Sequence, residues 1–302
     1  MTETGPSRPD GPTRSSRHPR LEQVGPRAIL MVILLLGFAL RVWGIGFGLP
    51  HLYHADEPAV VNHALAHGMG DLNPHYFKLP PLLHYVLFLL YAVYFALGRA
   101  LGHFPDADAF AALFFRDPTS FYLIGRLFAG AFLGTLSIYL AWRLGRKLYS
   151  DRAAVGGALF LAVSFLHVRD SHFAVYDIPL TAGLLACFLA LAGLLKRGSH
   201  RDYVVFGLLA GITTAAKYNG ALVLLPFFLA HGLRVRKEGR PWTACAADGK
   251  LLLALFAAGA AYFAGNPFSF LAFREFWQDF SIQAGAEAHV GFWHHLVYSL
   301  RE

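Results

Sequence analysis

The sequence predicts an all-α, polytopic integral membrane protein, and three observations carry this prediction. Hydrophobic residues make up 56% of the 302 residues and charged residues only 15%, whereas an ordinary soluble domain has about 25% charged residues. The mean hydropathy is +0.44. Long apolar stretches recur along the chain, as membrane-spanning helices require. The two cysteines supply neither a zinc set nor a disulfide framework, so disordered and disulfide-rich secreted classes are excluded.

The chain begins with a polar segment that differs sharply from the apolar sequence after it. Residues 1–27 are rich in Pro, Gly, Ser and Arg, which predicts a disordered tail. The apolar run 28–46 contains no charge before Arg41 and is too long for the apolar region of a cleavable signal, so we expect a first membrane span. Further apolar stretches lie near 81–102, 119–141, 153–168, 178–195, 203–216, 220–233 and 250–265.

Basic residues predict which side of the membrane each connection occupies. They cluster in 1–27, 143–152, 196–201 and 234–250, which together hold 17 of the 26 Lys and Arg. Cytoplasmic loops of membrane proteins carry this excess, so we assign these four segments and the N-terminus to the cytoplasm. The net charge of +7 is then a topology signal, and nucleic acid is excluded as a partner.

Parity limits the number of crossings. Three apolar stretches separate the tail from the basic segment 143–152, yet an even number of crossings must lie between two cytoplasmic segments. The stretch 81–102 follows Pro80 and contains His84 and several tyrosines, so we expect it to lie in, or dip into, the outer leaflet. Seven crossings of the cell membrane remain. The predicted extracytoplasmic segments are 47–118, 167–177, 217–219 and 266–302.

Two motifs in the first outer segment carry candidate chemistry. The motif His54-Ala55-Asp56-Glu57-Pro58 places adjacent carboxylates directly after a span, where they can act as a base, bind a metal or cap a helix that starts near Pro58. Lys78 is a lone cation in the aromatic stretch Asn73–Pro81. It can bind an anionic group, or it can extend its amine to the membrane interface as lysines near helix ends do.

Other ionisable residues lie at the predicted outer boundary. The second outer segment contains Asp170, His172 and Asp177, the last of which adjoins an uncharged run. Arg126 lies in the outer part of its span, and Lys217 lies at a break between two short helices. Ionisable groups at the edge of a membrane are costly and tend to be functional, and broken helices build sites at membrane depth.

Fifteen histidines invite a metal interpretation, but the sequence contains no HExxH motif and no Cys/His spacing that is typical of a metal site. We therefore expect no metal site and no required cofactor. If a divalent ion assists, Asp56 and Asp177 are its candidate ligands.

Several segments follow one another in a characteristic order. They are the two first-loop motifs, the second of which continues to Leu82-Leu83-His84-Tyr85, then Gly125-Arg126-Leu127, Asp170-Ser171-His172-Phe173 with Asp177-Ile178-Pro179-Leu180, Ala216-Lys217-Tyr218-Asn219-Gly220 and Asn266-Pro267-Phe268. In this order and spacing, from about residue 28 to 290, the chain resembles the polyprenyl-phosphate-sugar-dependent glycosyltransferases of the GT-C fold. It is most similar to family 39, which includes the protein O-mannosyltransferases and the lipid A aminoarabinose transferases.

The resemblance implies roles for the matching residues. Asp56 takes the place of the proposed catalytic aspartate, with Glu57 in support, and Lys78 takes that of a lysine that contacts the donor phosphate. Arg126 and Asp177 match a span arginine and a second-loop aspartate of the family. With Asp170, His172 and Lys217 they form the expected set of donor-phosphate and substrate-binding residues. Members of the family are usually much longer, which suggests that this chain is a C-terminally truncated fragment.

The implied reaction moves a hexose or pentose from a polyprenyl phosphate to a hydroxyl of a protein, a lipid or a cell-envelope glycan, on the extracytoplasmic face among membrane lipids. A carboxylate can accept the hydroxyl proton, and cations can neutralise the departing phosphate. A transporter or flippase of a lipid-linked or small polar solute is the alternative. It accounts for broken helices but leaves the carboxylate-bearing first loop unexplained, and a purely structural membrane subunit leaves the outer clustering unexplained.

Overall fold

The computed structural model describes residues 25–289, and within this range the fold is all-helical, with no strand. Helices make up 78% of these described residues, so the predicted all-α class is confirmed. The predicted disordered tail lies, except for its last three residues, outside the described residues.

The first half of the described chain contains α1 (Pro26–Val42), α2 (Glu57–Ala66), α3 (Leu82–Ala100), α4 (Ala107–Arg116), α5 (Thr119–Gly125), α6 (Leu133–Leu148), α7 (Asp151–Val163) and α8 (Phe165–Asp170). The second half contains α9 (Asp177–Arg197), α10 (His200–Ala216), α11 (Leu224–Lys237), α12 (Gly249–Gly265), α13 (Phe268–Leu271) and α14 (Phe273–His289). Shorter elements are the 3₁₀ turns η1 (His67–Met69), η3 (Tyr218–Val223) and η4 (Trp242–Ala244) and the π-helical segment η2 (Arg126–Phe132).

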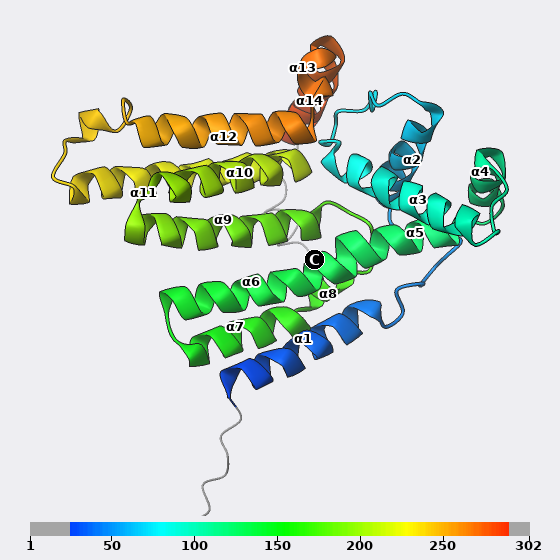
Figure 1. The fold of residues 1–302 in the computed structure, drawn as a ribbon, viewed down its shortest axis with the longest axis horizontal. Helices are drawn as coiled ribbons and strands as arrows, with labels where there is room; N and C mark the ends of the chain where they lie inside the picture. Colours follow the sequence, from blue (N-terminus) through cyan, green and yellow to red (C-terminus); the bar gives the residue numbers. More distant parts are fainter. Residues whose placement is uncertain (1–24, 290–302) are drawn as a thin grey trace, which may run out of the picture.

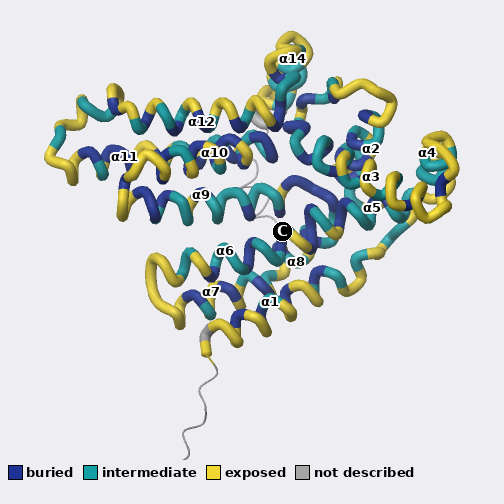
Figure 2. The backbone as a smooth tube through the Cα atoms, viewed as in Figure 1, coloured by how far each residue is buried: buried dark blue, intermediate teal, exposed yellow. Residues whose placement is uncertain are grey.

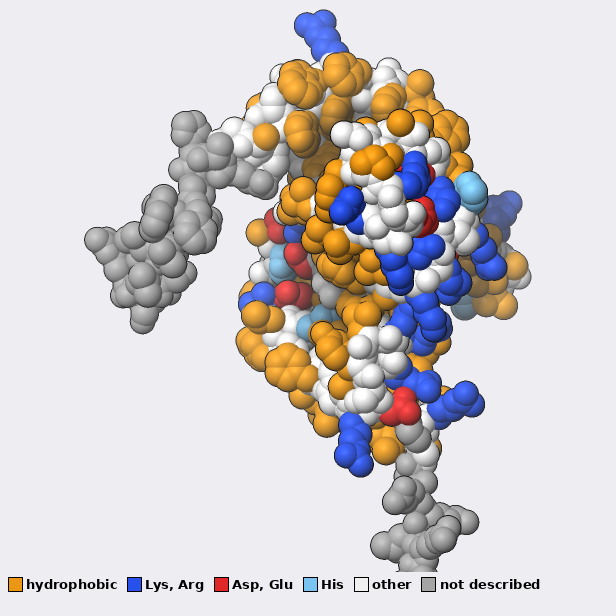
Figure 3. Space-filling view, turned by 90° about the vertical axis from the view of Figure 1, so that its left-hand side faces the viewer, with side chains coloured by type: hydrophobic (Ala, Val, Ile, Leu, Met, Phe, Trp, Pro, Cys, Tyr) orange, Lys and Arg blue, Asp and Glu red, His pale blue; other side chains and the backbone are white. Residues whose placement is uncertain are grey.

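The body of the molecule is a bundle of helices that run along one axis in alternating directions (Figure 1). Helices α1, α6, α7, α9, α10, α11 and α12 form this bundle, and they coincide with the stretches that the sequence assigns to the crossings. The start of α1 and the α6–α7, α9–α10 and α11–α12 connections lie at one end of the bundle, which we call the basic end. Figure 3 views the molecule from this end and shows lysine and arginine side chains gathered there.

The opposite end, which we call the outer end, carries the remaining helices. Helices α2, α3, α4, α5, α8, α13 and α14 lie there, together with the α8–α9 connection and the break between α10 and η3 (Figure 1). The bundle therefore separates the basic connections from the segments that contain the candidate site residues, as the positions of Lys and Arg predict.

Four helical segments among the described residues are long and apolar enough to cross a membrane: Leu82–Ala100, Thr119–Leu148, Asp177–Arg197 and Tyr218–Lys237. The first of these is α3, which the sequence analysis places outside the set of crossings. Helix α3 packs against α2 and α5 and touches α10, and it lies beyond the outer ends of α9, α10 and α12 rather than alongside them (Figure 1). This position favours the predicted placement, which stays a prediction.

The surface of the bundle is apolar. Figure 2 shows exposed residues recurring along the outward faces of its helices. They include large side chains such as Leu35, Phe160, Leu225 and Phe256, which are 62%, 74%, 67% and 75% exposed. Soluble proteins rarely expose apolar surface on this scale, so these faces suit lipid rather than water.

Small residues allow α10 and α12 to pack along their length. A Cβ atom added at Gly207 or Gly211 of α10 would come within 2.2 Å of the carbonyl oxygen of Ala254 or Ala258 of α12. Such close backbone approach is how small residues four positions apart hold membrane helices together without a hydrophobic driving force.

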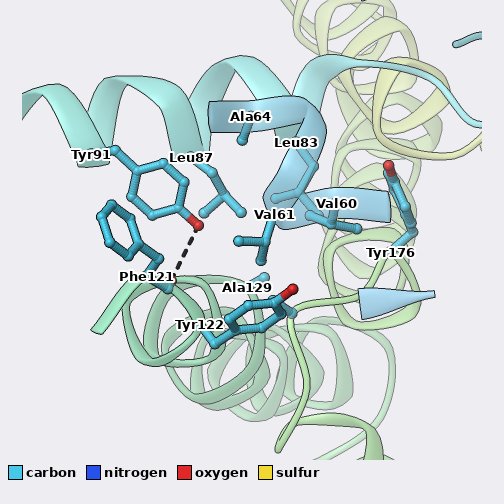
Figure 4. Packing of buried hydrophobic residues seen from close by; sticks show 11 residues of the cluster. Val60, Val61, Ala64, Leu83, Leu87, Tyr91, Phe121, Tyr122, Ala129 and Tyr176 are labelled. Carbon is cyan, nitrogen blue, oxygen red and sulfur yellow. Dashed lines mark hydrogen bonds between the residues drawn. The ribbon is translucent and has the colours of Figure 1, made fainter. Parts of the chain in front are cut away.

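A compact apolar cluster holds the outer end together (Figure 4). It joins α2, α3 and α5 to the α8–α9 connection through Val60, Val61, Ala64, Leu83, Leu87, Tyr91, Phe121, Tyr122, Ala129, Ala174 and Tyr176. The buried Tyr91 hydroxyl donates a hydrogen bond of 3.1 Å to the carbonyl of Phe121, so its one polar group is satisfied as buried tyrosines require. The cluster makes the first outer segment part of the packed structure.

A buried arginine fixes the start of the second outer segment. Arg41, near the end of α1, is fully buried and donates to the carbonyls of Ala162 and Leu161, at 3.1 and 3.2 Å, in the last turn of α7. It also contacts Nδ1 of His167 at 2.8 Å. The last carbonyls of a helix lack intrahelical partners and carry partial negative charge. Arg41 therefore supplies hydrogen bonds to the terminal carbonyls of α7, and it holds α8 against α1 through His167.

Candidate functional site

The predicted site residues all lie on elements of the outer end. Asp56 and Glu57 start α2, Lys78 precedes α3, Arg126 starts η2, Asp170 ends α8, His172 lies in the α8–α9 connection, Asp177 starts α9 and Lys217 follows α10. Segments that are distant in the sequence are thus brought to one end of the bundle (Figure 1).

Glu57 and Arg126 form a buried, bidentate ion pair. Nε and Nη2 of Arg126 each donate to a carboxylate oxygen of Glu57 at 2.7 Å. The side chains of Glu57 and Arg126 are 0% and 1% exposed, respectively. This fork-to-fork geometry is the strongest form of such a pair. The sequence suggests that Glu57 supports catalysis and that Arg126 binds donor phosphate, but in the structure each is the other's partner.

The pair also joins three outer segments through backbone contacts. Nη1 of Arg126 donates to the carbonyls of Ile45 and Phe47 at 2.8 and 2.9 Å, and the amide of Ala174 donates to Glu57 at 2.9 Å. The connection after α1, the start of α2 and the α8–α9 connection therefore meet at one buried point. Nε, Nη1 and Nη2 of the guanidinium are thus engaged by the first loop and by the connection after α1.

Asp56 lies in a different environment. Its side chain is exposed and makes no hydrogen bond or ion pair with the described residues, and it does not cap α2 although it occupies the N-cap position. Burial raises the pKa of Tyr76, and the negative charge of Asp56 raises it further. Burial likewise raises the pKa of Tyr176, with smaller contributions from Tyr76, Tyr218 and Asp56. Asp56 is therefore a free carboxylate beside tyrosine hydroxyls that stay protonated.

Lys78 also has no partner among residues 25–289, and its side chain is exposed. It extends from the irregular segment between η1 and α3, directly after the fully buried Phe77. Of the three cations predicted to bind phosphate, Lys78, Arg126 and Lys217, Lys78 is the one whose hydrogen-bonding capacity is unused within the described structure.

Lys217 and Asp177 form an ion pair between the end of α10 and the start of α9. Nζ of Lys217 lies 2.7 Å from Oδ1 of Asp177, with side chains 24% and 55% exposed. Asp177 is in the first turn of α9, where a carboxylate favours the positive end of the helix dipole. Lys217 has extended backbone where α10 ends. The predicted break therefore exists, and it presents a cation to the outer end.

The second outer segment lines a shallow recess. Asp170 is paired with its neighbour Arg169 at 2.8 Å. The ring nitrogens of His172 lie 2.8 and 2.9 Å from the carbonyl oxygens of Val168 and Trp43. The recess has a volume of about 350 Å³ and is lined by Trp43, Gly44, Phe47, Arg126, Arg169, His172 and Phe173. Its aromatic and basic lining suits a polar ligand with an apolar face.

The structure adds residues for which the sequence carries little signal. Nε2 of His84 and the hydroxyl of Tyr176 lie 2.6 Å apart in a buried contact, and the ring of His63 stacks against those of Tyr76 and His84. His84 stands out in the sequence as a lone histidine in an apolar stretch, but nothing in the sequence pairs it with the residue before Asp177. Asp279 of α14 is a further addition, and its acidic character alone gives no clue to its partner.

A second cavity, of about 760 Å³, lies between α2, α3 and α4 and contains none of the predicted site residues. Its lining is almost entirely apolar, with Asn62 and Asp108 as the polar exceptions. It faces the side of α2 that carries Asn62 and Leu65, whereas His63 stacks toward Tyr76.

Within residues 25–289, no group of three or more His, Cys, Asp or Glu side chains is arranged to hold a metal ion. Of the two candidate ligands, Asp177 is engaged by Lys217, and Asp56 has no hydrogen bond or ion pair from its side chain to the described part of the chain.

Comparison with known proteins identifies one family. The model of the dolichyl-phosphate-mannose-protein mannosyltransferase family matches residues 107–263, more than half of the chain. The matched range contains Arg126, Asp170, His172, Asp177 and Lys217, whereas Asp56, Glu57 and Lys78 precede it. No curated protein and no solved structure matches the chain.

Proposed function

Since this chain belongs to the dolichyl-phosphate-mannose-protein mannosyltransferase family, we propose that it transfers a hexose, with mannose as the first candidate, from a polyprenyl phosphate to an acceptor hydroxyl. The chain is a membrane glycosyltransferase of the mannosyltransferase type with a GT-C fold, and the transporter alternative is set aside. The donor, the acceptor and the extracytoplasmic face are the parts that we propose.

The observation that carries the proposal is the free carboxylate of Asp56. A sugar on a polyprenyl phosphate already has a good leaving group, so the enzyme must mainly orient the acceptor and remove its proton. In our proposal Asp56 accepts the proton of the acceptor hydroxyl while the hydroxyl oxygen bonds to the anomeric carbon. The bond from that carbon to the phosphate oxygen breaks, and its electron pair leaves with the lipid phosphate. A positioned general base contributes about 10²–10⁴-fold to a rate.

Lys78 is the proposed cation for the leaving phosphate. Its ammonium is exposed and unpaired within the described residues, so it can meet a phosphate without first breaking an ion pair. Charge grows on the phosphate as the glycosidic bond breaks, and a cation held at that point stabilises the transition state. Lys217, which Asp177 already neutralises, is proposed as a second and weaker contact.

We propose a different role for Glu57 and Arg126. They hold the first loop against the α8–α9 connection, and so they place Asp56. His172 lines the recess beside Trp43 and Phe173, which we propose as the place of the acceptor or of the sugar ring, and Asp170 acts there through its ion pair with the lining residue Arg169. The acceptor itself is a hydroxyl of a protein, a lipid or a cell-envelope glycan.

The proposed chemistry uses side chains of this chain and no required cofactor. The described residues offer one unpaired carboxylate at this point, which is a poor donor set for a divalent ion that takes six or more oxygen ligands. We therefore expect transfer to continue at the same rate after dialysis against a chelator. A rate that falls with EDTA and returns with Mg²⁺ or Mn²⁺ would assign Asp56 to a metal instead.

The test uses the full chain in liposomes with a polyprenyl-phosphate-linked mannose as donor and surface-exposed hydroxyl acceptors. Lys78→Gln should lower kcat/KM for the donor by about 10²-fold, comparable to the loss of one charge-stabilising group. Lys78→Arg should retain more activity, although a planar guanidinium does not reproduce a point charge. Transfer by Lys78→Gln at the wild-type rate, with normal protein levels, would remove Lys78 from the site.

A further inference from the structure

The peptide groups on both sides of Phe77, the residue before Lys78, are held by different parts of the fold. The amide of Phe77 donates to Oδ2 of Asp279, on α14, at 2.8 Å. The carbonyl of Phe77 accepts from the hydroxyl of Tyr218, at the start of η3, at 2.9 Å. The side chain of Phe77 is fully buried, so the backbone from which Lys78 extends is fixed on each side.

Aromatic rings also pack around Phe77. The ring of Phe77 meets that of Phe276 on α14 edge to face, with centroids 5.9 Å apart. The ring of Tyr218 contacts Phe276 and Phe280, at 6.3 and 5.3 Å. Edge-to-face pairs at these distances contribute beyond the area they bury. The loop before α3, the break after α10 and helix α14 therefore form one small core around Phe77.

Helix α14 also contacts the segment before α3 a few residues N-terminal to Phe77. Oε2 of Glu275 lies 2.8 Å from Nδ1 of His75 and 3.3 Å from Nδ2 of Asn73. Glu275 and Asp279 are four residues apart, so they share one face of α14, with Phe276 next to Glu275. This face presents two carboxylates and an aromatic ring to the segment that leads to Lys78.

We infer that Asp279 and Tyr218 are positioning residues for donor binding: they fix the peptide groups on either side of Phe77 and so set the place of the Lys78 ammonium. The inference rests on the proposed role of Lys78. The lysine side chain is long and flexible, so its anchor decides which positions its ammonium can reach. A displacement of about 1 Å in a positioning element can cost about 10²-fold in rate.

The first test compares two substitutions that differ in one atom's capacity to accept a hydrogen bond. Asp279→Asn retains a carbonyl oxygen for the amide of Phe77, whereas Asp279→Ala removes it. We expect Asp279→Ala to raise KM for the lipid-linked donor about 10-fold with a smaller change in kcat, and Asp279→Asn to stay near wild type. Tyr218→Phe, which removes the hydroxyl donor, should shift KM in the same direction. Gln278→Ala, an exposed neighbour on α14, is the matched control.

A double-mutant cycle separates positioning from a general structural role. If Asp279 acts through Lys78, then Asp279→Ala should change donor KM little in a Lys78→Gln background, because the group that it positions is already gone. Equal loss in both backgrounds would overturn the inference, as would a loss in Asp279→Asn as large as that in Asp279→Ala.

The last test does not depend on activity. In the full chain carrying Cys187→Ala and Cys245→Ser, Lys78→Cys is labelled with a soluble maleimide, and its labelling rate is compared between the Asp279→Ala, Asp279→Asn and Gln278→Ala backgrounds. We expect the rate to change about 5-fold or more with Asp279→Ala alone. Equal rates overturn the inference whether or not the enzyme transfers sugar. An enzyme that transfers no sugar but shows the expected change in labelling would overturn the proposed function while the restraint on Lys78 stands.

Discussion

Asp56 and Glu57 are neighbours in the chain, yet their carboxylates lie in opposite environments: Glu57 is fully buried on Arg126, and Asp56 is exposed without a partner among the described residues. The division follows from the start of α2, where successive side chains point in directions about 100° apart, as 3.6 residues per turn require. One carboxylate is thereby committed to the fold, and the other stays available for chemistry.

The first prediction separates these two carboxylates. Asp56→Asn should abolish sugar transfer and leave thermal stability unchanged, since the carboxylate makes no hydrogen bond or ion pair with the described residues and does not cap α2. Glu57→Gln should instead reduce the amount of folded protein. Transfer and the midpoint of thermal unfolding are measured on the same preparations in detergent. Near-normal turnover in Asp56→Asn would show that Asp56 is not the base, because Asn lacks a group that can accept the proton.

The second prediction concerns the buried pair. Removal of one partner leaves an uncompensated buried charge, so Glu57→Gln or Arg126→Gln alone should each cost about 3–5 kcal/mol of unfolding free energy. The double substitution should cost less than the sum of the two, since both charges then leave together. Denaturant titrations of the four proteins measure the coupling. Additive losses would mean that the two side chains do not interact as the 2.7 Å contacts indicate.

The third prediction concerns pH and the contact between α14 and the first loop. Hydrogen bonds to Asp71 and then to Glu275 raise the pKa of His75 above its ordinary value of 6.5. The stabilisation that protonated His75 gives to the folded state is therefore complete below about pH 6.5, and it is lost as the pH rises through the raised pKa. A hydrogen bond from His75 is the main cause that lowers the pKa of Asp71 below 3.8. The stabilisation that ionised Asp71 gives to the folded state is therefore present above about pH 3.8, and it is lost as the pH falls through the lowered pKa.

The contact should therefore be tightest between about pH 4 and pH 6.5. Nitroxide labels on Leu72→Cys and Gln278→Cys, in a background without native cysteines, measure it. The distance distribution should be narrow at about pH 5.5 and broader at about pH 9. His75→Gln serves as the control, in which the distribution should no longer depend on pH over this range. Identical distributions in the histidine-containing protein at both pH values would contradict the assignment.

The fourth prediction tests the packing of α10 on α12. Gly211→Ala should destabilise the protein by about 1–3 kcal/mol, as overpacking of a tight interface does, because the new Cβ would lie 2.2 Å from the carbonyl oxygen of Ala258. Gly259→Ala on α12 is the matched control. Its Cβ would meet no atom within 4 Å, and alanine has the higher helix propensity, so stability should be unchanged or slightly higher. Equal melting midpoints for the two variants would contradict the packing.

The fifth prediction concerns α3. Its place beyond the ends of α9, α10 and α12 leads us to expect that it does not cross the membrane. Ala107→Cys should then react with an impermeant thiol reagent in intact cells, and Ser150→Cys should react only after the cells are opened. Reversed labelling of the two positions would overturn both the placement of α3 and the sidedness derived from lysine and arginine.

Much of the fold could be predicted from the sequence because hydrophobicity and charge act locally. Apolar length marks each bundle helix, and the positions of Lys and Arg sort the connections to one end. The family resemblance is confirmed over residues 107–263. Short elements were harder to predict from the sequence. Helices α8 and α13 have only six and four residues, and their presence depends on contacts such as those of Arg41 rather than on a periodic pattern.

The sequence could predict which residues belong to the candidate site, but not how they are arranged. Charges at the outer boundary are unusual wherever they occur, so the predicted set could be selected without knowing its geometry. Partner choice is a three-dimensional property, and the sequence does not pair Glu57 with Arg126, 69 residues away, or Phe77 with Asp279, 202 residues away. For this reason the sequence could not show that Glu57 and Arg126 contact each other.

The anchor of Phe77 on α14 also orders events during synthesis. At about 5–20 residues per second, Asp279 is added about 10–40 s after Phe77, since 202 residues separate them. During that interval the segment that carries Lys78 has been made but its C-terminal anchor has not. A nascent chain that ends before α14 therefore lacks the hydrogen bond from the amide of Phe77 to Asp279 and the contacts of Glu275 with His75 and Asn73. If Lys78 binds the donor phosphate as we propose, its binding place is completed only after α14 has been synthesised.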